Sequence, residues 1–160
     1  MKRIEFLAFV KVTASAKTPT RAHFYDAGID VYADLKFKTN YITIPPGTGQ
    51  VISTGLKFIV PRGFMLEVKN RSSVAVKQNL IVGACVIDSG YDGEVFINLN
   101  NIGNETRIVK HGDKIAQLVV IPVECCILIE CTEDEVGEGN KKISARGDKA
   151  LGSSDGDQNE

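Results

Sequence analysis

Apolar and polar residues alternate along several short stretches of the chain. Apolar side chains fall at every second position in residues 56–60, 64–69 and 95–99, the pattern of strands that bury one face. Two later stretches, IAQLVVIPV and CCILIE, are apolar throughout and rich in β-branched residues, which predicts strands buried on both faces. The spacing predicts an all-β fold, either a sandwich, a jelly roll or a barrel.

Turn signals separate these strands. The candidates are Pro45-Pro46-Gly47, Gly49, Gly55, Gly90 and Gly112, because glycine and proline favour tight turns. No long stretch has a helical period. One short helix is expected, starting near Ser72-Ser73 and covering VAVKQN.

The C-terminal segment differs in composition from the rest of the chain. From Glu133 onwards it has few large apolar residues and many Gly, Ser and charged residues, so it has little to contribute to a core. We therefore expect a β-rich core over residues 1–132 and a flexible arm over 133–160. Composition alone favours disorder for the arm. An anion-binding loop would also suit Arg146, Gly147, Gly152, Ser153 and Ser154, since glycine and serine let backbone N–H groups converge on phosphate.

Composition narrows the functional class. A chain of 160 residues is long enough to bury the core of one domain. A net charge of −1 argues against coating a nucleic acid polymer but leaves room for a small phosphorylated ligand. No run reaches the length of a membrane-spanning helix, and the N-terminus is too polar for a signal peptide. We expect a cytoplasmic protein without membrane contact, or one in the host cytoplasm if it is viral.

The cysteines lack the spacing of a zinc site. Cys85, Cys125, Cys126 and Cys131 form no CxxC pair. They are expected to be reduced thiols on buried strands.

The first candidate functional residues lie in the stretch GACVIDSGYDGEVFINL, which starts at Gly83. Asp88 opens an Asp-Ser-Gly sequence, which is a common turn. It could equally be a general base that orients water, with Tyr91 as a flat platform beside a ring or sugar. On the residues alone, both interpretations stay open.

Three further positions have a structural and a functional interpretation. In Arg71-Ser72-Ser73, a serine could cap a helix, or the helix start with its hydroxyls could cradle a phosphate. Gln117 places an amide within an apolar strand and is expected to bind a backbone carbonyl. Asp30 is a polar residue near a strand start.

The order of these segments is more specific than any one of them. AGIDVYAD, RSSVAVK, VGACVIDSGYDGEV, GDKIAQLVV and RGDKALGSS follow one another from about Ala27 to Ser154. In this order they resemble the five motifs of the trimeric dUTPase family (deoxyuridine triphosphate nucleotidohydrolase). The resemblance implies a jelly-roll-like β sandwich. It also implies a homotrimer in which each active site draws on all three chains and the arm of one chain closes over a site formed by the others.

The resemblance also implies residue roles. Asp88 matches the general base that aligns water for attack on the α-phosphorus of dUTP, which releases pyrophosphate and leaves dUMP. Asp30 matches an aspartate near the water shell of Mg²⁺. Tyr91 packs under the deoxyribose, and the stretch from Val82 to Ile87 is expected to be a hairpin that reads uracil. The substrate-binding positions implied are Arg71, Ser72, Ser73, Val82, Cys85, Val86, Ile87, Tyr91, Phe96, Gln117, Arg146, Leu151, Gly152, Ser153 and Ser154.

The chain departs from the family pattern at several positions. Lys149-Ala150-Leu151 stands where the family arm has Gly-Gly-Phe, so Leu151 replaces the aromatic that caps uracil. Ser73 stands where glycine is usual, and Asn70 where proline is usual. These departures concern closure of the arm more than the chemistry.

Two alternatives belong to other functional classes. dCTP deaminases share the fold and the Arg-Ser-Ser sequence, but their catalytic Glu falls at Asn98 here, and an amide cannot shuttle the proton that deamination needs. A non-catalytic nucleotide sensor or protein-binding module would have no need for the water-orienting carboxylate of Asp88.

Overall fold

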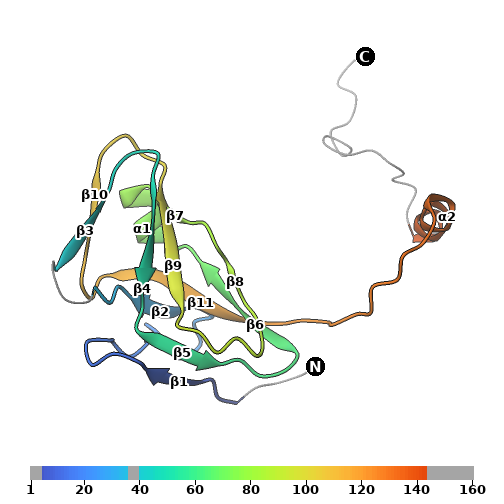
Figure 1. Cartoon of the computed structure of the whole chain (residues 1–160), viewed down its shortest axis with the longest axis horizontal. Coiled ribbons are helices and arrows are strands. Elements are labelled where there is room, and N and C mark those ends of the chain that lie inside the picture. The colour runs from blue at the N-terminus through green and yellow to red at the C-terminus, as the bar shows by residue number, and fades with distance from the viewer. Residues whose placement is uncertain (1–4, 36–39, 144–160) are drawn as a thin grey trace. The chain divides into compact units, whose positions relative to one another are not determined.

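The structure is a computed structural model that describes residues 5–35 and 40–143. Two compact units make up the chain, Met1–Glu124 and Cys125–Glu160. The strands of the first unit are short and stack in layers (Figure 1). In chain order the elements are β1 (Ala8–Lys11), β2 (Ile29–Tyr32), β3 (Tyr41–Ile44), β4 (Gly49–Ser53), β5 (Leu56–Ile59), β6 (Phe64–Lys69), α1 (Ser72–Gln78), β7 (Leu80–Val82), β8 (Val86–Ile87), β9 (Phe96–Asn101), β10 (Arg107–Lys110), β11 (Lys114–Pro122) and α2 (Glu133–Ile143).

Two antiparallel sheets carry most of the core. One has the strand order β2-β11-β6-β8 and the other β4-β9-β7, while β1 pairs with β5 and β3 with β10. The predicted alternation is present: Leu66 and Val68 of β6 are buried, as are Ile97 and Leu99 of β9, and all four join a single hydrophobic cluster. The predicted all-β, jelly-roll-like fold is confirmed.

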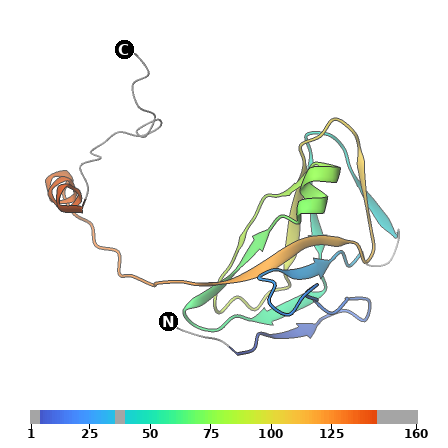
Figure 2. The same ribbon diagram turned by 180° about the vertical axis from the view of Figure 1, so that it is seen from behind.

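The short helix α1 is where the sequence predicts it, and it lies beside β7 in both views (Figures 1 and 2). Its N-cap is Arg71, without a side-chain capping bond, so neither serine serves as the cap. It ends at Asn79, which adopts a left-handed φ of 53° and donates its N–H to the Ala75 carbonyl. This left-handed residue is a common helix C-terminus and turns the chain directly into β7.

Most of the predicted turns are present. Gly47, Gly55, Gly90 and Gly112 all have positive φ, the conformation that favours glycine. Gly49 is an exception, because it begins strand β4 instead of forming a turn.

The prediction of a buried strand at CCILIE is wrong. Residues 125–132 form no strand, and the side chains of Ile127, Leu128 and Ile129 are 88%, 90% and 79% exposed. The predicted burial of the thiols fails with it, since Cys125, Cys126 and Cys131 are free and exposed, and Cys85 is half-buried. The apolar pattern is that of a strand, but among the described residues no other segment pairs with it.

The second unit contains the helix α2, which the sequence analysis did not predict. Thr132 and Glu135 form a capping box: the Thr132 N–H donates to Glu135 Oε2 at 2.9 Å, and the Glu135 N–H donates to Thr132 Oγ1 at 3.4 Å. The Thr132 backbone N–H is the main cause that lowers the pKa of Glu135, followed by its hydroxyl. Three acidic residues in the first turn also suit the positive end of the helix dipole. The signal was therefore present in TEDE, although the apolar pattern was weak.

Other expectations about the arm and location stay predictions. The boundary between residues 132 and 133 is one of them. Residues 144–160, which hold Arg146, Leu151, Gly152, Ser153 and Ser154, lie outside the described residues. Within the described ranges, no helix has the length and apolar character needed to cross a membrane.

Candidate active site

Asp88 and Tyr91 line one small pocket of about 210 Å³. Strand β8 ends just before Asp88, and β9 begins at Phe96, so the turn between them supplies the acid and the ring. The pocket combines the ionisable side chains of Asp88 and Glu94 with apolar side chains in and beside β8 and β9. Its lining consists of Val86, Ile87, Asp88, Tyr91, Glu94, Val95 and Phe96.

The turn that carries Asp88 is fixed at both ends. The Tyr91 N–H donates to the Asp88 carbonyl at 3.2 Å, and Gly90 has a φ of 90°. Ser89 Oγ donates to the Val60 carbonyl at 3.1 Å, which ties the turn to the end of β5. Asp-Ser-Gly is therefore a turn, as one interpretation of the sequence predicts, and this turn places the Asp88 carboxyl group at a pocket.

Tyr91 is half-exposed and its ring is held in place. Its hydroxyl donates to the Glu94 carbonyl at 3.0 Å, and a side chain at Gly93 would overlap the phenol ring. A flat ring fixed at its far end is suited to pack against a planar or ring-shaped ligand.

Asp30, Arg71, Ser72 and Gln117 line a different pocket, of about 390 Å³. Strand pairing brings them together: Gln117 of β11 lies opposite Asp30 of β2 on one side and Lys69 of β6 on the other. Arg71 follows β6 directly and precedes α1. Three segments distant in sequence thus meet at one place. The remaining lining residues are Ala22, Asp26, Ala27 and Gly28.

Two cations hold the buried carboxylate of Asp30. Arg71 Nε lies 2.7 Å from Asp30 Oδ1, and Lys114 Nζ lies 2.7 Å from Asp30 Oδ2. The hydrogen bond to Asp30 raises the pKa of the Lys114 ammonium, which keeps it charged. Arg71 also donates through Nη1 to Ser73 Oγ at 3.3 Å. Asp30, Arg71 and Lys114 together carry a net charge of +1, which the Asp26 carboxylate in the same pocket lining offsets.

Gln117 makes the bond that the sequence predicts for it. Its Nε2 donates to the Asn70 carbonyl at 2.8 Å. Its Oε1 lies against Gly28, where any side chain would overlap it. The amide therefore joins the segment before α1 to the loop before β2.

The segment from Val82 to Ile87 is not a hairpin of two paired strands. Strand β7 pairs with β9, whereas β8 pairs with β6, so the segment passes from one sheet to the other. Separate hydrogen bonds fix it: Val82 N–H donates to Asn70 Oδ1 at 2.7 Å, and Gly83 N–H donates to the Asn98 carbonyl at 2.9 Å. The Cys85 carbonyl accepts from Val68 N–H at 2.8 Å.

The structure thus brings the predicted residues together in two groups. The two pockets share no lining residue. Ser73, Val82 and Cys85 line neither of them. Ser73 and Cys85 are each adjacent in sequence to a lining residue, whereas Val82 is not. Lys114 and Glu94 are the residues that sequence reasoning missed. The stretch GDKIAQ contained a signal for Lys114. A lysine at the start of the strand that carries Gln117 lies near the neighbouring strand that carries Asp30.

A β sandwich with a carboxylate–tyrosine pocket and a separate pocket that presents the Arg71 guanidinium is suited to a ligand that combines a ring with an anionic group. The family model described as dUTPase matches residues 14–154, and the chain belongs to the dUTPase family. The predicted family is thereby confirmed.

Individual relatives agree with this family. The chain is 36% identical over 154 residues to the deoxyuridine 5'-triphosphate nucleotidohydrolase of Mycobacterium marinum, covering 94% of this chain and 95% of the relative. The enzyme of the same name from Mycobacterium tuberculosis strain H37Rv has the same identity and coverage. Among solved structures, a mutant dUTPase of Staphylococcus bacteriophage 80alpha with dUpNHpp matches with a TM-score of 0.80 and 25% identity, covering 94% of this chain and 99% of that one.

Proposed function

We propose that this chain hydrolyses dUTP to dUMP and pyrophosphate, with Asp88 orienting and deprotonating the water that attacks the α-phosphorus. The observation that carries the proposal is the pocket in which a turn-borne carboxyl group and a fixed tyrosine lie side by side. A carboxylate within reach of a water molecule is suited to act as a general base. The relatives named deoxyuridine 5'-triphosphate nucleotidohydrolase support dUTP as the substrate.

The Asp88 pocket is the half-site for the nucleoside. Tyr91 would pack against the deoxyribose and leave no room for a 2′-hydroxyl group. Val86, Ile87 and Phe96 would border the base, and backbone groups of residues 82–87 would read its edge. The hydrogen bonds that fix this segment from Asn70, Asn98 and Val68 support such a role, because a rigid backbone discriminates better than a mobile one.

The Asp30 pocket is the half-site for the phosphates. Arg71 and Ser72 would bind phosphate oxygens, and Gln117 holds the loop around them. Lys114 neutralises Asp30, so that the N–H groups of Arg71 not engaged by Asp30 remain available for the anion. A bidentate guanidinium is well suited to this contact.

Mg²⁺ fits this pocket through water better than through direct ligation. Both oxygens of Asp30 already accept bonds from Arg71 and Lys114, so the carboxylate would hold a metal-bound water more readily than the ion itself. Mg²⁺ commonly takes few protein ligands in phosphate sites. When bound, it would offset the charge on the leaving pyrophosphate. The phage phi11 dUTPase mutant, 25% identical with a TM-score of 0.72, is reported with a coordinated structural Mg(II) ion.

The separation of the half-sites supports a homotrimer with shared active sites. One chain presents the nucleoside pocket and the phosphate pocket with no common lining residue. In the proposed trimer, Asp88 and Tyr91 of one chain face Asp30, Arg71 and Gln117 of another. The arm of a third chain, with Arg146, Leu151, Gly152, Ser153 and Ser154, closes over the nucleotide.

The second unit supplies further support for assembly. Ile127, Leu128 and Ile129 expose apolar side chains along a segment that forms no strand in the described chain. Exposed contiguous apolar residues are typical of surfaces that another chain covers. The proposed trimer would bury this segment.

Product analysis tests the proposed reaction. The purified chain with Mg²⁺ is given dUTP, dCTP, dTTP or UTP, and products are separated by chromatography. dUMP and pyrophosphate from dUTP alone are expected. Ammonia from dCTP would favour the deaminase alternative, and bound but intact dUTP would favour a sensor; either result would overturn the proposal.

Mixing two inactive variants should restore activity if sites are shared between chains. Asp88→Asn damages the nucleoside half-site, and Arg71→Ala damages the phosphate half-site. Trimers reassembled from both contain some sites that combine two intact halves, so we expect a substantial fraction of wild-type turnover to return. The measurement is dUTP hydrolysis before and after denaturing and refolding the mixture.

The matched control for this experiment is each variant refolded alone, which should stay inactive. Persistent inactivity of a mixture that contains folded mixed trimers would show that one chain supplies the whole site.

A further inference from the structure

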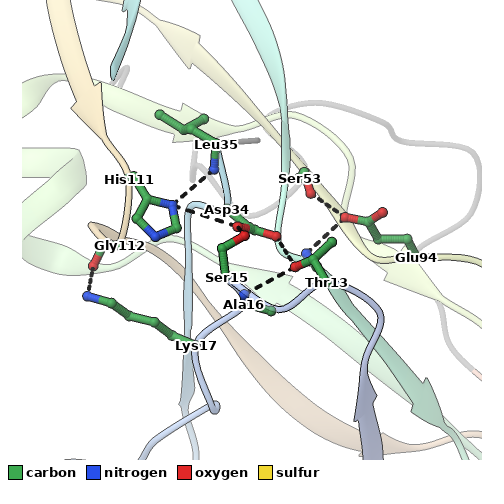
Figure 3. A network of polar contacts seen from close by, with 11 residues as sticks. Thr13, Ser15, Ala16, Lys17, Asp34, Leu35, Ser53, Glu94, His111 and Gly112 are labelled. Carbon is green, nitrogen blue, oxygen red and sulfur yellow. Dashed lines mark hydrogen bonds and ion pairs between the residues drawn. The ribbon is translucent and has the colours of Figure 1, made fainter. Parts of the chain in front are cut away.

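The Glu94 side chain joins the nucleoside pocket to the turn between β4 and β5. Ser53 Oγ donates to Glu94 Oε1, and the Gly55 N–H donates to the same oxygen at 2.8 Å. Figure 3 shows Ser53, at the end of β4, and Glu94, two residues before β9, pointing toward each other. Glu94 is partly buried and lines the pocket of Asp88 and Tyr91.

The next residue is tied to the same turn. Val95 N–H donates to the Leu56 carbonyl at 2.8 Å, and the Val95 carbonyl accepts from Thr54 Oγ1 at 2.6 Å. Four hydrogen bonds therefore attach residues 94–95 to residues 53–56, and the Glu94 carboxylate accepts two of them.

The turn is itself held on its other side. The Asp34 N–H donates to the Ser53 carbonyl at 2.7 Å, and the Val12 N–H donates to the Gly55 carbonyl at 2.8 Å. Gly55 has a φ of 66°, and a side chain there would overlap Asp34 Oδ2 and Thr13 Oγ1. Asp34 is 1% exposed and lies within the polar network of Figure 3. Glu94 is thus anchored to a rigid part of the core.

This anchor reaches Tyr91 through the backbone of Glu94. The Tyr91 hydroxyl donates to the Glu94 carbonyl at 3.0 Å, so the position of that carbonyl sets the position of the ring. We propose that Glu94 is a positioning residue that determines discrimination between deoxyribose and ribose nucleotides by fixing Tyr91. The inference rests on the proposed function, in which Tyr91 packs against the sugar.

The geometry separates this role from the attack on phosphorus. The turn that carries Asp88 is attached beside the end of β5 by a different hydrogen bond, from the hydroxyl of Ser89 to the Val60 carbonyl. Loss of the Glu94 carboxylate would loosen the ring while leaving that bond in place. A loosened ring admits a 2′-hydroxyl more easily, so discrimination should fall more than turnover of dUTP.

The experiment measures the ratio of kcat/KM for dUTP to kcat/KM for UTP in the full-length protein with Mg²⁺. Glu94→Ala should lower this ratio about three- to tenfold, the factor that one hydrogen bond is worth. Glu94→Gln keeps an acceptor for Ser53 and Gly55 and should keep most of the ratio. An unchanged ratio in Glu94→Ala, or an equal loss in both variants, would overturn the inference.

A double-mutant cycle identifies the route of the effect. Tyr91→Phe keeps the ring and removes only the hydroxyl that binds Glu94, so it should lower the same ratio. If Glu94 acts through that hydroxyl, combining Glu94→Ala with Tyr91→Phe should lower the ratio no further than Tyr91→Phe alone. Multiplying losses would overturn the inference, because a merely structural role would act independently of the hydroxyl.

Two controls keep the outcome interpretable. Ser53→Ala removes one donor to the carboxylate from outside the pocket; it should lower the ratio in the same direction, and it replaces Glu94→Ala if that variant does not fold. The wild type is assayed first. Failure to hydrolyse dUTP would contradict the proposed function, whereas dUTP hydrolysis with an unaltered ratio in folded variants would contradict this inference alone.

Discussion

Asp88→Asn is expected to lower kcat for dUTP by about 10²- to 10⁴-fold, the range associated with loss of a general base. The substitution changes little volume. Within the described residues the Asp88 side chain makes no hydrogen bond that the substitution would remove. The turn is held instead by the backbone and by Ser89. The fold and assembly should therefore be retained. Steady-state kinetics with circular dichroism and size-exclusion chromatography would measure both.

Asp92→Asn is the matched control for this variant. The chemical change is the same and lies four positions along the chain, but the Asp92 side chain is 98% exposed, pairs loosely with Lys57 at 3.6 Å and lines no part of the pocket. Its kcat should stay close to that of the wild type. A similar loss in both variants, or a near-native rate in Asp88→Asn, would contradict the role given to Asp88.

Removal of residues 146–160 is expected to lower kcat/KM for dUTP by about a hundredfold or more, because the arm would position the phosphates and exclude water. Among the residues that the structure describes, the hydrophobic core lies entirely before Cys125, so thermal unfolding should change little. Kinetics and calorimetry on the same preparation would separate the two effects.

A shorter deletion provides the control. Removing residues 155–160 leaves Arg146, Leu151, Gly152, Ser153 and Ser154 in place and should leave kcat/KM nearly unchanged. If the longer deletion were equally harmless, the arm would have no part in substrate capture.

Local pattern predicted the fold well where a strand finds its partners within the chain. β6 and β9 bury the alternating residues that the sequence indicated, and α1 lies at SSVAVKQ. The pattern failed at CCILIE because apolar and β-branched character favours a strand but does not show that a partner strand is present in the same chain. α2 was missed because its capping box is a polar signal, which a search for apolar periodicity overlooks.

The residues of the candidate site fall into the same two groups: those predictable from local sequence and those that depend on how the chain folds. Asp88, Tyr91 and Phe96 are close in sequence, so their shared pocket could be expected. The meeting of Asp30, Arg71 and Gln117 depends on strand register, and it was predicted only through the order of the motifs. Lys114 and Glu94 contact Asp30 and the 53–55 turn, respectively, and such partners are visible only once the chain is folded.

The separation of the two half-sites has a consequence for inheritance. In the proposed trimer, a chain that carries only a damaged Asp88 spoils a single site, and its phosphate half still serves the active site of a neighbour. A chain damaged at both Asp88 and Arg71 would spoil one site with each half. Where sound and defective copies are produced in the same cell, the doubly damaged allele should therefore be the more dominant, although each is equally inactive alone.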